Sequence, residues 1–180
     1  MKRLRIGLDI DDTVCSFMSP YLKRFGKPKD DNEIANNVNN VLINDKTFWN
    51  SLPIINKPNF KPILYCTNRV HNKIWTKEYL SLHNIEAPIY QTNDKLSKIK
   101  GKVDVFIDND ISNFIDLNEH KVPCLLMDDD YNKKWGPIAR IYSLEYKEIE
   151  YCYKLFINTL YPYFKELVNE YRKNKIRATT

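Results

Sequence analysis

Short apolar segments of strand-like composition, most of them ending in polar residues, recur along the chain and alternate with segments of helical spacing. The strand-like segments are 3–10, 63–66, 88–91, 103–107 and 122–127. The helical segments lie at 17–25, 72–82 and 111–119, followed by a region from about 144 to 173 that Pro162 should interrupt. Strands that alternate with helices favour a parallel sheet. We therefore expect an α/β fold: a doubly wound, Rossmann-like parallel sheet with helices on both faces.

Residues 17–60, between the first two expected strands, differ from the rest of the chain. From residue 29 onward they are rich in Asn and Asp, and their apolar residues gather in two small patches, at 38–42 and 48–52. A chain of 180 residues has room for one compact domain with a small insertion. We expect a small, partly helical cap over 17–60, inserted into a core made of 1–16 and 61–180.

The glycine, histidine and cysteine residues exclude several classes of site. The four glycines, at positions 7, 26, 101 and 136, are too scattered for the G-x-G-x-x-G or G-x-x-x-x-G-K-[ST] phosphate loops. No H-E-x-x-H or C-x-x-C pattern occurs, so we expect no zinc site. The cysteines are widely spaced in apolar stretches and are expected to be reduced thiols: Cys15, Cys66, Cys124 and Cys152.

Hydropathy and charge limit the expected partners. No apolar run approaches the roughly 20 residues that cross a bilayer, and the basic start has no signal-peptide cleavage site, so we expect a cytoplasmic protein with no membrane partner. The net charge of +5 suits anionic partners. Part of this excess lies near the C-terminus and is most simply a solvated helix end, with cations at Lys165, Arg172, Lys173, Lys175 and Arg177.

Three of the expected strands end in reactive polar residues. These are Asp9, Asp11, Asp12 and Thr13 after the first, Thr67, Asn68 and Arg69 after the second, and Asp108, Asn109 and Asp110 after the fourth. The carboxyl ends of parallel strands meet at one edge of the sheet, so these side chains should converge in one crevice. Carboxylates gathered there repel unless a cation holds them, and oxygen ligands favour Mg²⁺. The pattern predicts a magnesium-dependent active site.

These residue types suit the transfer of a phosphoryl group. Asp9 is the expected nucleophile, which attacks phosphorus and forms an aspartyl phosphate. Asp11 is expected to give a proton to the leaving oxygen and later to take one from water. Thr67 and a nearby lysine would contact the phosphoryl oxygens, and Asp108 would complete the metal site.

This constellation resembles the haloacid dehalogenase-like (HAD) superfamily of phosphohydrolases. The resemblance covers roughly residues 3–128 and rests on four motifs in order: an apolar strand followed by Asp9-x-Asp11-x-Thr13, a strand ending in Thr67, the lysine Lys95, and a strand ending in the acidic cluster at Asp108. It implies that the metal is held by the Asp9 carboxylate, the Asp11 backbone carbonyl and the Asp108 carboxylate. Lys98, in the same basic run, is the alternative to Lys95.

Within that superfamily the chain is most similar to the 5′(3′)-deoxyribonucleotidase-like group. The shared features are Phe17, the pair Phe48 and Trp49, the run Asn93-Asp94-Lys95, and the late residues Asp130, Tyr131, Asn132 and Arg140. The resemblance implies that Phe17, Phe48 and Trp49 line a pocket for the base, with core packing as the alternative for the last two. Asn68 and Arg69 are candidate substrate-binding residues, although Arg69 could instead pair with a neighbouring acid. Asn109 replaces one of the paired acids usual in the fourth motif, and Asp110 is the candidate substitute.

The expected function is therefore Mg²⁺-dependent hydrolysis of a small phosphomonoester, most plausibly a nucleoside monophosphate, as in a 5′(3′)-nucleotidase. Two alternatives stay open: a phosphatase acting on the 3′ or 5′ ends of nucleic acids, and a HAD-like binding protein without activity. A receiver-like signalling domain is disfavoured, because there the lysine follows the last acidic motif, whereas here Asp108 follows Lys95. The sequence leaves the oligomeric state open, a homodimer included.

Overall fold

The computed structural model of the chain describes residues 3–136 and 138–177. In this part of the chain a single six-stranded parallel sheet has the order β3-β2-β1-β4-β5-β6. The strands are β1 (Ile6–Leu8), β2 (Leu64–Thr67), β3 (Ile89–Gln91), β4 (Val105–Asp108), β5 (Cys124–Met127) and β6 (Arg140–Ile141). The five expected strands are all present, with bounds that differ from those expected by up to three residues, and the short segment after Gly136 adds the sixth.

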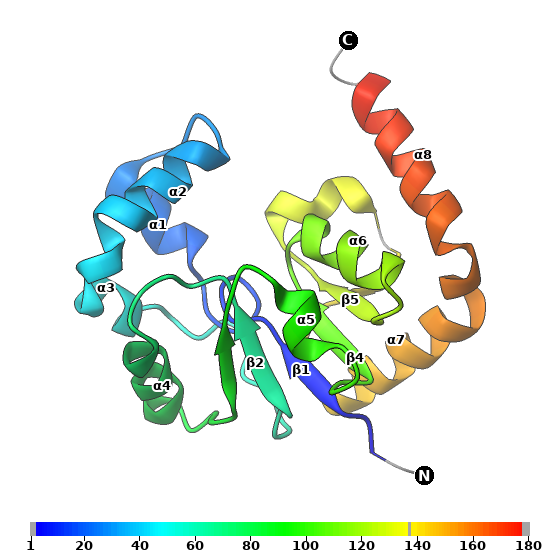
Figure 1. Cartoon of the computed structure of the whole chain (residues 1–180), viewed down its shortest axis with the longest axis horizontal. Helices are drawn as coiled ribbons and strands as arrows, with labels where there is room; N and C mark the ends of the chain where they lie inside the picture. Colours follow the sequence, from blue (N-terminus) through cyan, green and yellow to red (C-terminus); the bar gives the residue numbers. More distant parts are fainter. Residues whose placement is uncertain (1–2, 137, 178–180) are drawn as a thin grey trace.

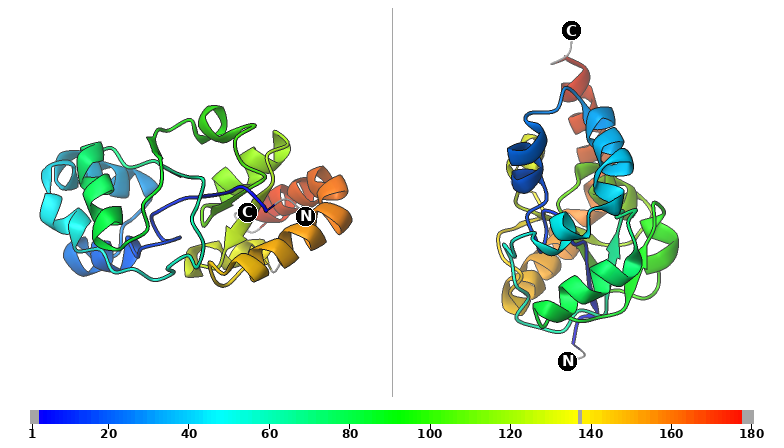
Figure 2. Two further views of the ribbon diagram at one scale, coloured as in Figure 1. Left: turned by 90° about the horizontal axis from the view of Figure 1, so that it is seen from below. Right: turned by 90° about the vertical axis from the view of Figure 1, so that its left-hand side faces the viewer.

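Helices flank this sheet, so the expected α/β class is confirmed. Those of the core are α4 (Lys73–Leu82), α5 (Lys95–Ile99), α6 (Ile111–Glu119), α7 (Tyr146–Thr159) and α8 (Phe164–Arg177), with single 3₁₀ segments η2 (Asp130–Trp135) and η3 (Tyr161–Tyr163). Figure 2 shows α5 and α6 on one side of the sheet and α7 on the other. The long C-terminal helical region breaks at η3, which contains Pro162, as the sequence predicts.

The two middle strands of the sheet, β1 and β4, approach each other closely. Gly7, in the middle of β1, is required by the close approach of its neighbours, because an added Cβ would lie 2.9 Å from side-chain atoms of both Phe106 and Val103. The strand order reverses between these two strands, and a parallel sheet binds ligands at the carboxyl ends of such a pair. Asp9 directly follows β1, and Asp108 is the last residue of β4.

The inserted cap contains α1 (Met18–Phe25), α2 (Asp31–Asn40), η1 (Leu42–Asn44) and α3 (Lys46–Asn50). In Figure 1 the cap, coloured blue to cyan, stands to one side of the strand ends, with α6 and α8 on the other. Two chain segments join the cap to the core, since Ser16 N donates to the carbonyl of Pro53 (2.9 Å) and Ile55 N to that of Val14 (2.9 Å).

The cap therefore ends near residue 53, and the expected boundary at residue 60 is too late. Residues 59 and 60, which follow the two segments that join the cap to the core, belong to the core. The Asn59 side chain accepts a hydrogen bond from Tyr146 N (2.9 Å), and the Phe60 ring packs edge-on against that of Tyr146. The expected boundary was based on local composition, and composition does not reveal such hydrogen bonds and aromatic contacts between distant segments.

The remaining sequence expectations concern the surface and the thiols. Cys15, Cys66 and Cys124 are buried, Cys152 is half-buried, and all four are free thiols. Of the basic residues near the C-terminus, Lys165, Arg172 and Lys173 are exposed, whereas the side chains of Lys175 and Arg177 lie outside the described residues. None of the described helices combines the length and apolar character that crossing a bilayer demands.

Candidate active site

A cleft of about 970 Å³ lies over the carboxyl ends of β1, β2 and β4 and extends between the cap and α8. Its lining includes Asp9, Asp11, Thr67, Asn68, Arg69, Lys95 and Asp108 from the strand ends and α5, Phe17, Ile34, Val38 and Trp49 from the cap, Asp116 and Glu119 from α6, and Tyr131, Lys134 and Arg172 at the far side. All three sets of strand-end residues expected to converge therefore meet in one cleft.

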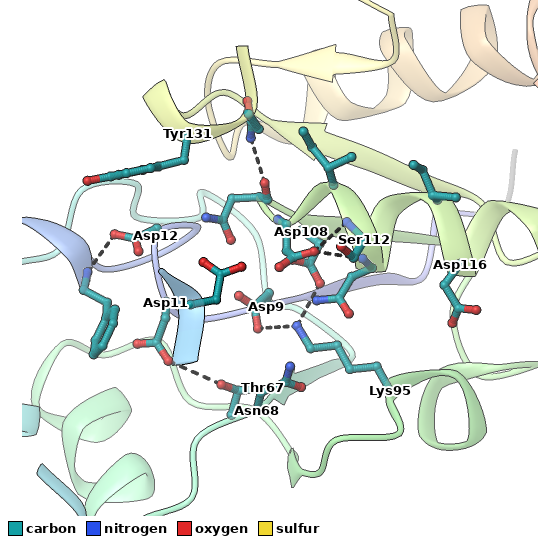
Figure 3. Close-up of a pocket in the computed structure, with 18 of the residues that line it drawn as sticks. Asp9, Asp11, Asp12, Thr67, Asn68, Lys95, Asp108, Ser112, Asp116 and Tyr131 are labelled. Atoms are coloured by element: carbon teal, nitrogen blue, oxygen red, sulfur yellow. Dashed lines mark hydrogen bonds and ion pairs between the residues drawn. The ribbon is translucent and has the colours of Figure 1, made fainter. Parts of the chain in front are cut away.

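At its centre one lysine bridges two aspartates. Lys95 Nζ lies 2.8 Å from Asp9 Oδ1 and 2.8 Å from Asp108 Oδ2, and all three side chains are buried. Figure 3 shows the three side chains directed at one another. Lys95 is the first residue of α5, whose start is fixed by the Asp94 side chain accepting from Ser97 N (3.0 Å). Lys98 is exposed, so Lys95 is the lysine that lies at the strand ends.

The three groups carry a net charge of −1 when ionised. Burial raises the pKa of Asp9 to about 8, against the opposing effect of Lys95, and burial also raises the pKa of Asp108. Although burial disfavours the charged lysine, the two carboxylates raise its pKa. One ammonium thus leaves a buried negative charge uncompensated, and a further cation would stabilise the ionised pair.

The loop after β4 separates the acid of the site from the acid that caps the next helix. Asp108 Oδ1 accepts a hydrogen bond from Asp110 N (3.0 Å), which fixes the carboxylate from behind. Asp110 itself caps α6, accepting from Ser112 N (2.6 Å) and Asn113 N (3.0 Å). Asp110 is therefore engaged as a helix cap.

The oxygen-only donors at this point suit a hard cation. Within the described residues no group of three or more His, Cys, Asp or Glu side chains is arranged to hold a metal ion. A cation here would therefore bind the carboxylates of Asp9 and Asp108, and backbone and water oxygens would have to supply its other ligands. Two carboxylates plus neutral oxygens are a donor set typical of Mg²⁺.

Asp11, beside this group, is held by an arginine. Arg69 Nε lies 3.1 and 3.0 Å from the two carboxylate oxygens of Asp11, and Nη2 lies 2.7 Å from Oδ1. Thr67 Oγ1 lies 3.5 Å from Asp11 Oδ2 and accepts from Arg69 N (3.3 Å). Of the two interpretations left open for Arg69, the structure shows pairing with a neighbouring acid. Asn68, between them, is exposed at the cleft.

The other two polar residues that follow β1, Asp12 and Thr13, hold the inserted cap in place, and Asp12 also lines the cleft. Asp12 has a positive φ of 53°, and its Oδ1 accepts from Phe17 N (2.8 Å) and Met18 N (3.0 Å) at the start of α1. Burial raises the pKa of Asp12 to about 7, although these two bonds favour the carboxylate. Thr13 is fully buried, and its carbonyl accepts a hydrogen bond from the Asn56 side chain (3.1 Å) where the cap joins the core. The strand-end pattern placed Asp12 among the acids but did not predict that its side chain accepts hydrogen bonds from the first backbone N–H groups of α1.

Two of the three expected base-binding aromatics face the cleft. Phe17 and Trp49 line it, with their rings stacked at 5.7 Å between centroids and an interplanar angle of 14°. Phe48 does not line the cleft: it is 7% exposed and packs edge-on against both Trp49 and Phe17. The expectation that Phe48 contacts the base is therefore corrected, because α3 directs neighbouring side chains to different sides and Phe48 points into the cap.

An aromatic residue at the opposite side of the cleft was not among the expected site residues. Tyr131 is 58% exposed, and Figure 3 shows it above Asp12. Its neighbour Asn132 holds the η2 segment in place by donating to the carbonyls of Asn109 (2.8 Å) and Met127 (2.7 Å). The side chain of Asn132 also binds Arg140. In the sequence, the run Asp130-Tyr131-Asn132 was the feature that could have predicted an aromatic residue on this side of the cleft.

Comparisons with known proteins do not assign the chain to a family. No protein-family model matches the sequence, and neither does any curated protein.

Proposed function

We propose that this protein is a Mg²⁺-dependent phosphomonoester hydrolase of the HAD-like type, acting on a nucleoside monophosphate. The observation that carries the proposal is the buried group of Asp9, Lys95 and Asp108, with Asp11 beside it, at the point where the strand order reverses. A buried carboxylate that is paired with a lysine and opens onto a cleft is equipped to act as a nucleophile.

The carboxylates of Asp9 and Asp108, with the backbone carbonyl of Asp11, would hold Mg²⁺. When bound, the cation neutralises charge on the phosphoryl oxygens and on the two carboxylates. Lys95 contributes the second positive charge, at 2.8 Å from each carboxylate, and orients Asp9. Because Lys95 contacts both acids, its first role is to hold them, and contact with the substrate phosphate would be a second one.

The reaction proceeds in two steps. A carboxylate oxygen of Asp9 forms a bond to phosphorus while the bond from phosphorus to the leaving oxygen breaks, and Asp11, which must enter this step as the neutral acid, gives its proton to that oxygen. A water molecule then attacks phosphorus, Asp11 takes a proton from it, and the bond between Asp9 and phosphorus breaks. The products are an alcohol and inorganic phosphate, and both aspartates return to their starting state.

The cleft walls support a nucleoside as the leaving group. Phe17, half-buried and backed by the buried Trp49, offers aromatic surface on one side, and the exposed Tyr131 offers it on the other, which suits a planar base. The more distant lining is of mixed charge, because Glu119 pairs with Arg172 at 3.1 Å and Lys134 lies in the same lining as Asp116. The preference for a single nucleotide therefore rests on the aromatic residues of the cleft and not on its charge.

Phosphate release from a panel of nucleoside 5′- and 3′-monophosphates, with and without Mg²⁺, tests the proposal. The wild type should release phosphate only with the metal, and Asp9→Asn should reduce the release to background. Asp116→Asn, an exposed acid in the same cleft, is the matched control and should retain activity. Activity of Asp9→Asn equal to that of the wild type, or no release from any member of the panel by the wild type, would refute the proposal.

A further inference from the structure

Arg69 has the geometry of a clamp on the carboxylate of Asp11. Its Nε and Nη2 reach both oxygens at 2.7 to 3.1 Å, the fork arrangement that fixes a carboxylate in orientation as well as in position. We propose that Arg69 is a positioning residue that aims Asp11 at the leaving oxygen. This inference rests on the proposed function and adds to it a residue that acts through Asp11.

Arg69 is itself held on every side. Its side chain is 1% exposed, and its guanidinium carbon lies 5.2 Å from the ring centroid of Trp49 and 5.4 Å from that of Tyr79. Nη2 also donates to Cys15 Sγ at 3.2 Å, and the carbonyl of Arg69 accepts from the Gln91 side chain at 3.1 Å. A donor held this firmly transmits its position to the carboxylate that it binds.

The same contacts argue against direct recognition of the substrate phosphate by Arg69. Nε and Nη2 are occupied by Asp11, and Nη1, which has no hydrogen-bond partner among the described residues, is buried. A phosphate would have to displace Asp11 to reach this arginine. Lys95, by contrast, lies beside the expected nucleophile Asp9.

The clamp also links the cap to the acid. Trp49 belongs to α3 of the cap, stacks on Phe17 at the cleft, and covers Arg69 on its other side. Arg69 in turn belongs to the core and holds Asp11. A substrate that packs against the cap aromatics would therefore contact residues that hold Arg69, which in turn orients Asp11, the expected proton donor.

The chemistry of the leaving group separates this role from others. A nucleoside alkoxide leaves slowly unless it is protonated, so its departure depends on a well-aimed Asp11, whereas p-nitrophenolate leaves readily without a proton. Loss of the clamp should slow the first step for a nucleoside monophosphate by about 10²-fold or more, in the range that general acid catalysis supplies. The burst of p-nitrophenolate from p-nitrophenyl phosphate, which reports the same step, should change little.

Rapid-quench kinetics with the full-length protein and Mg²⁺ provide the test, using Arg69→Gln and Arg69→Lys on both substrates. Arg69→Lys keeps the charge without the fork, so it should show the same selective loss and also carries the test if Arg69→Gln does not fold. In an Asp11→Asn background the added Arg69→Lys change should have no further effect, because the two residues act as one unit. Arg5→Gln, which breaks a half-buried bidentate pair with Asp104 away from the cleft lining, is the control and should leave both rates unchanged.

The outcomes are distinct. An equal loss on both substrates with a raised KM would make Arg69 a phosphate-binding residue and would overturn the inference, as would an undiminished nucleotide rate in both variants. A wild type without activity on either substrate would instead refute the proposed function.

Discussion

Asp9 and Asp108 end two adjacent strands, β1 and β4, and each places one carboxylate oxygen 2.8 Å from the same ammonium group, that of Lys95. Burial raises the pKa of both carboxylates against the opposing effect of Lys95, and the three ionised groups together carry a net negative charge. This relationship is the basis for expecting a metal ion at the site, and it can be tested apart from catalysis.

Mg²⁺ should stabilise the protein through Asp108. A ligand that binds only the folded state raises the melting temperature, by an amount that grows with the logarithm of the free ligand concentration above its Kd. We expect Mg²⁺ to raise the Tm of the wild type and of Asp116→Asn, whose changed side chain is exposed on α6, but not that of Asp108→Asn. Thermal unfolding with and without Mg²⁺ measures the shift, and an equal shift in Asp108→Asn would contradict the assignment.

Gly7→Ala should destabilise the fold. The added methyl group would lie 2.9 Å from side-chain atoms of Phe106 and Val103, so the centre of the sheet must shift to admit it. Overpacking of this kind costs about 1–3 kcal/mol of unfolding free energy, which urea denaturation measures. Val103→Ala removes one of the two clashes, so the cost of Gly7→Ala should shrink in that background. An undiminished cost there would show that another contact is responsible.

His71 should make stability depend on pH in the acid range. Burial, with a contribution from Arg69, lowers its pKa to about 4 from an ordinary value near 6.5. Between about pH 6.5 and 4 the unfolded chain therefore binds a proton at His71 while the folded chain does not. The unfolding free energy should fall as the pH falls through that range, by at most about 1.4 kcal/mol per pH unit.

The measurement compares the unfolding free energies of the wild type and of His71→Phe between about pH 4 and pH 7. This interval covers the folded and the unfolded pKa of His71. The aromatic replacement retains packing between Trp49 and Trp75. The difference between the two proteins should change with pH in this window, whereas His120→Gln, at an exposed histidine, should follow the wild type. A constant difference between wild type and His71→Phe would contradict the lowered pKa.

The strand-end chemistry of this fold could be predicted from the sequence, whereas the contacts between cap and core could not. Each apolar run stops at its polar residues, and a parallel sheet brings such ends together, so Asp9, Thr67 and Asp108 were identified from local pattern alone. The family resemblance favours Lys95 with Lys98 as the alternative, and the structure distinguishes them, because Lys95 is buried and Lys98 is exposed.

The pairing of Arg69 with Asp11, the capping of α1 by Asp12 and the burial of Phe48 each depend on how two distant segments pack. Local sequence pattern does not encode such contacts. Both Phe48 and Trp49 are buried, for example, but only Trp49 borders the cleft, which depends on how α3 is rotated about its axis against the core.

Tyr131 should select substrates that carry a base. Its ring lies across the cleft from Phe17 and Trp49, and stacking of a base on an aromatic side chain is worth about 1–3 kcal/mol. Tyr131→Ala should raise KM for a nucleoside monophosphate by about tenfold, which falls within that energy range, and leave hydrolysis of ribose 5-phosphate unchanged. Tyr142→Ala, an equally exposed tyrosine outside the cleft lining, is the control. Equal effects of Tyr131→Ala on both substrates would rule out base recognition.

The most direct test of the central claim is to trap the phosphoryl group on the protein. The wild type is mixed with a substrate and Mg²⁺, quenched in acid within one turnover and analysed by peptide mass spectrometry. We expect the peptide containing Asp9 to gain the mass of one phosphoryl group, fragmentation to place that group on Asp9, and Asp9→Asn to show no such peptide. Active wild-type protein that carries the phosphoryl group on another residue, or on none, would contradict this expectation.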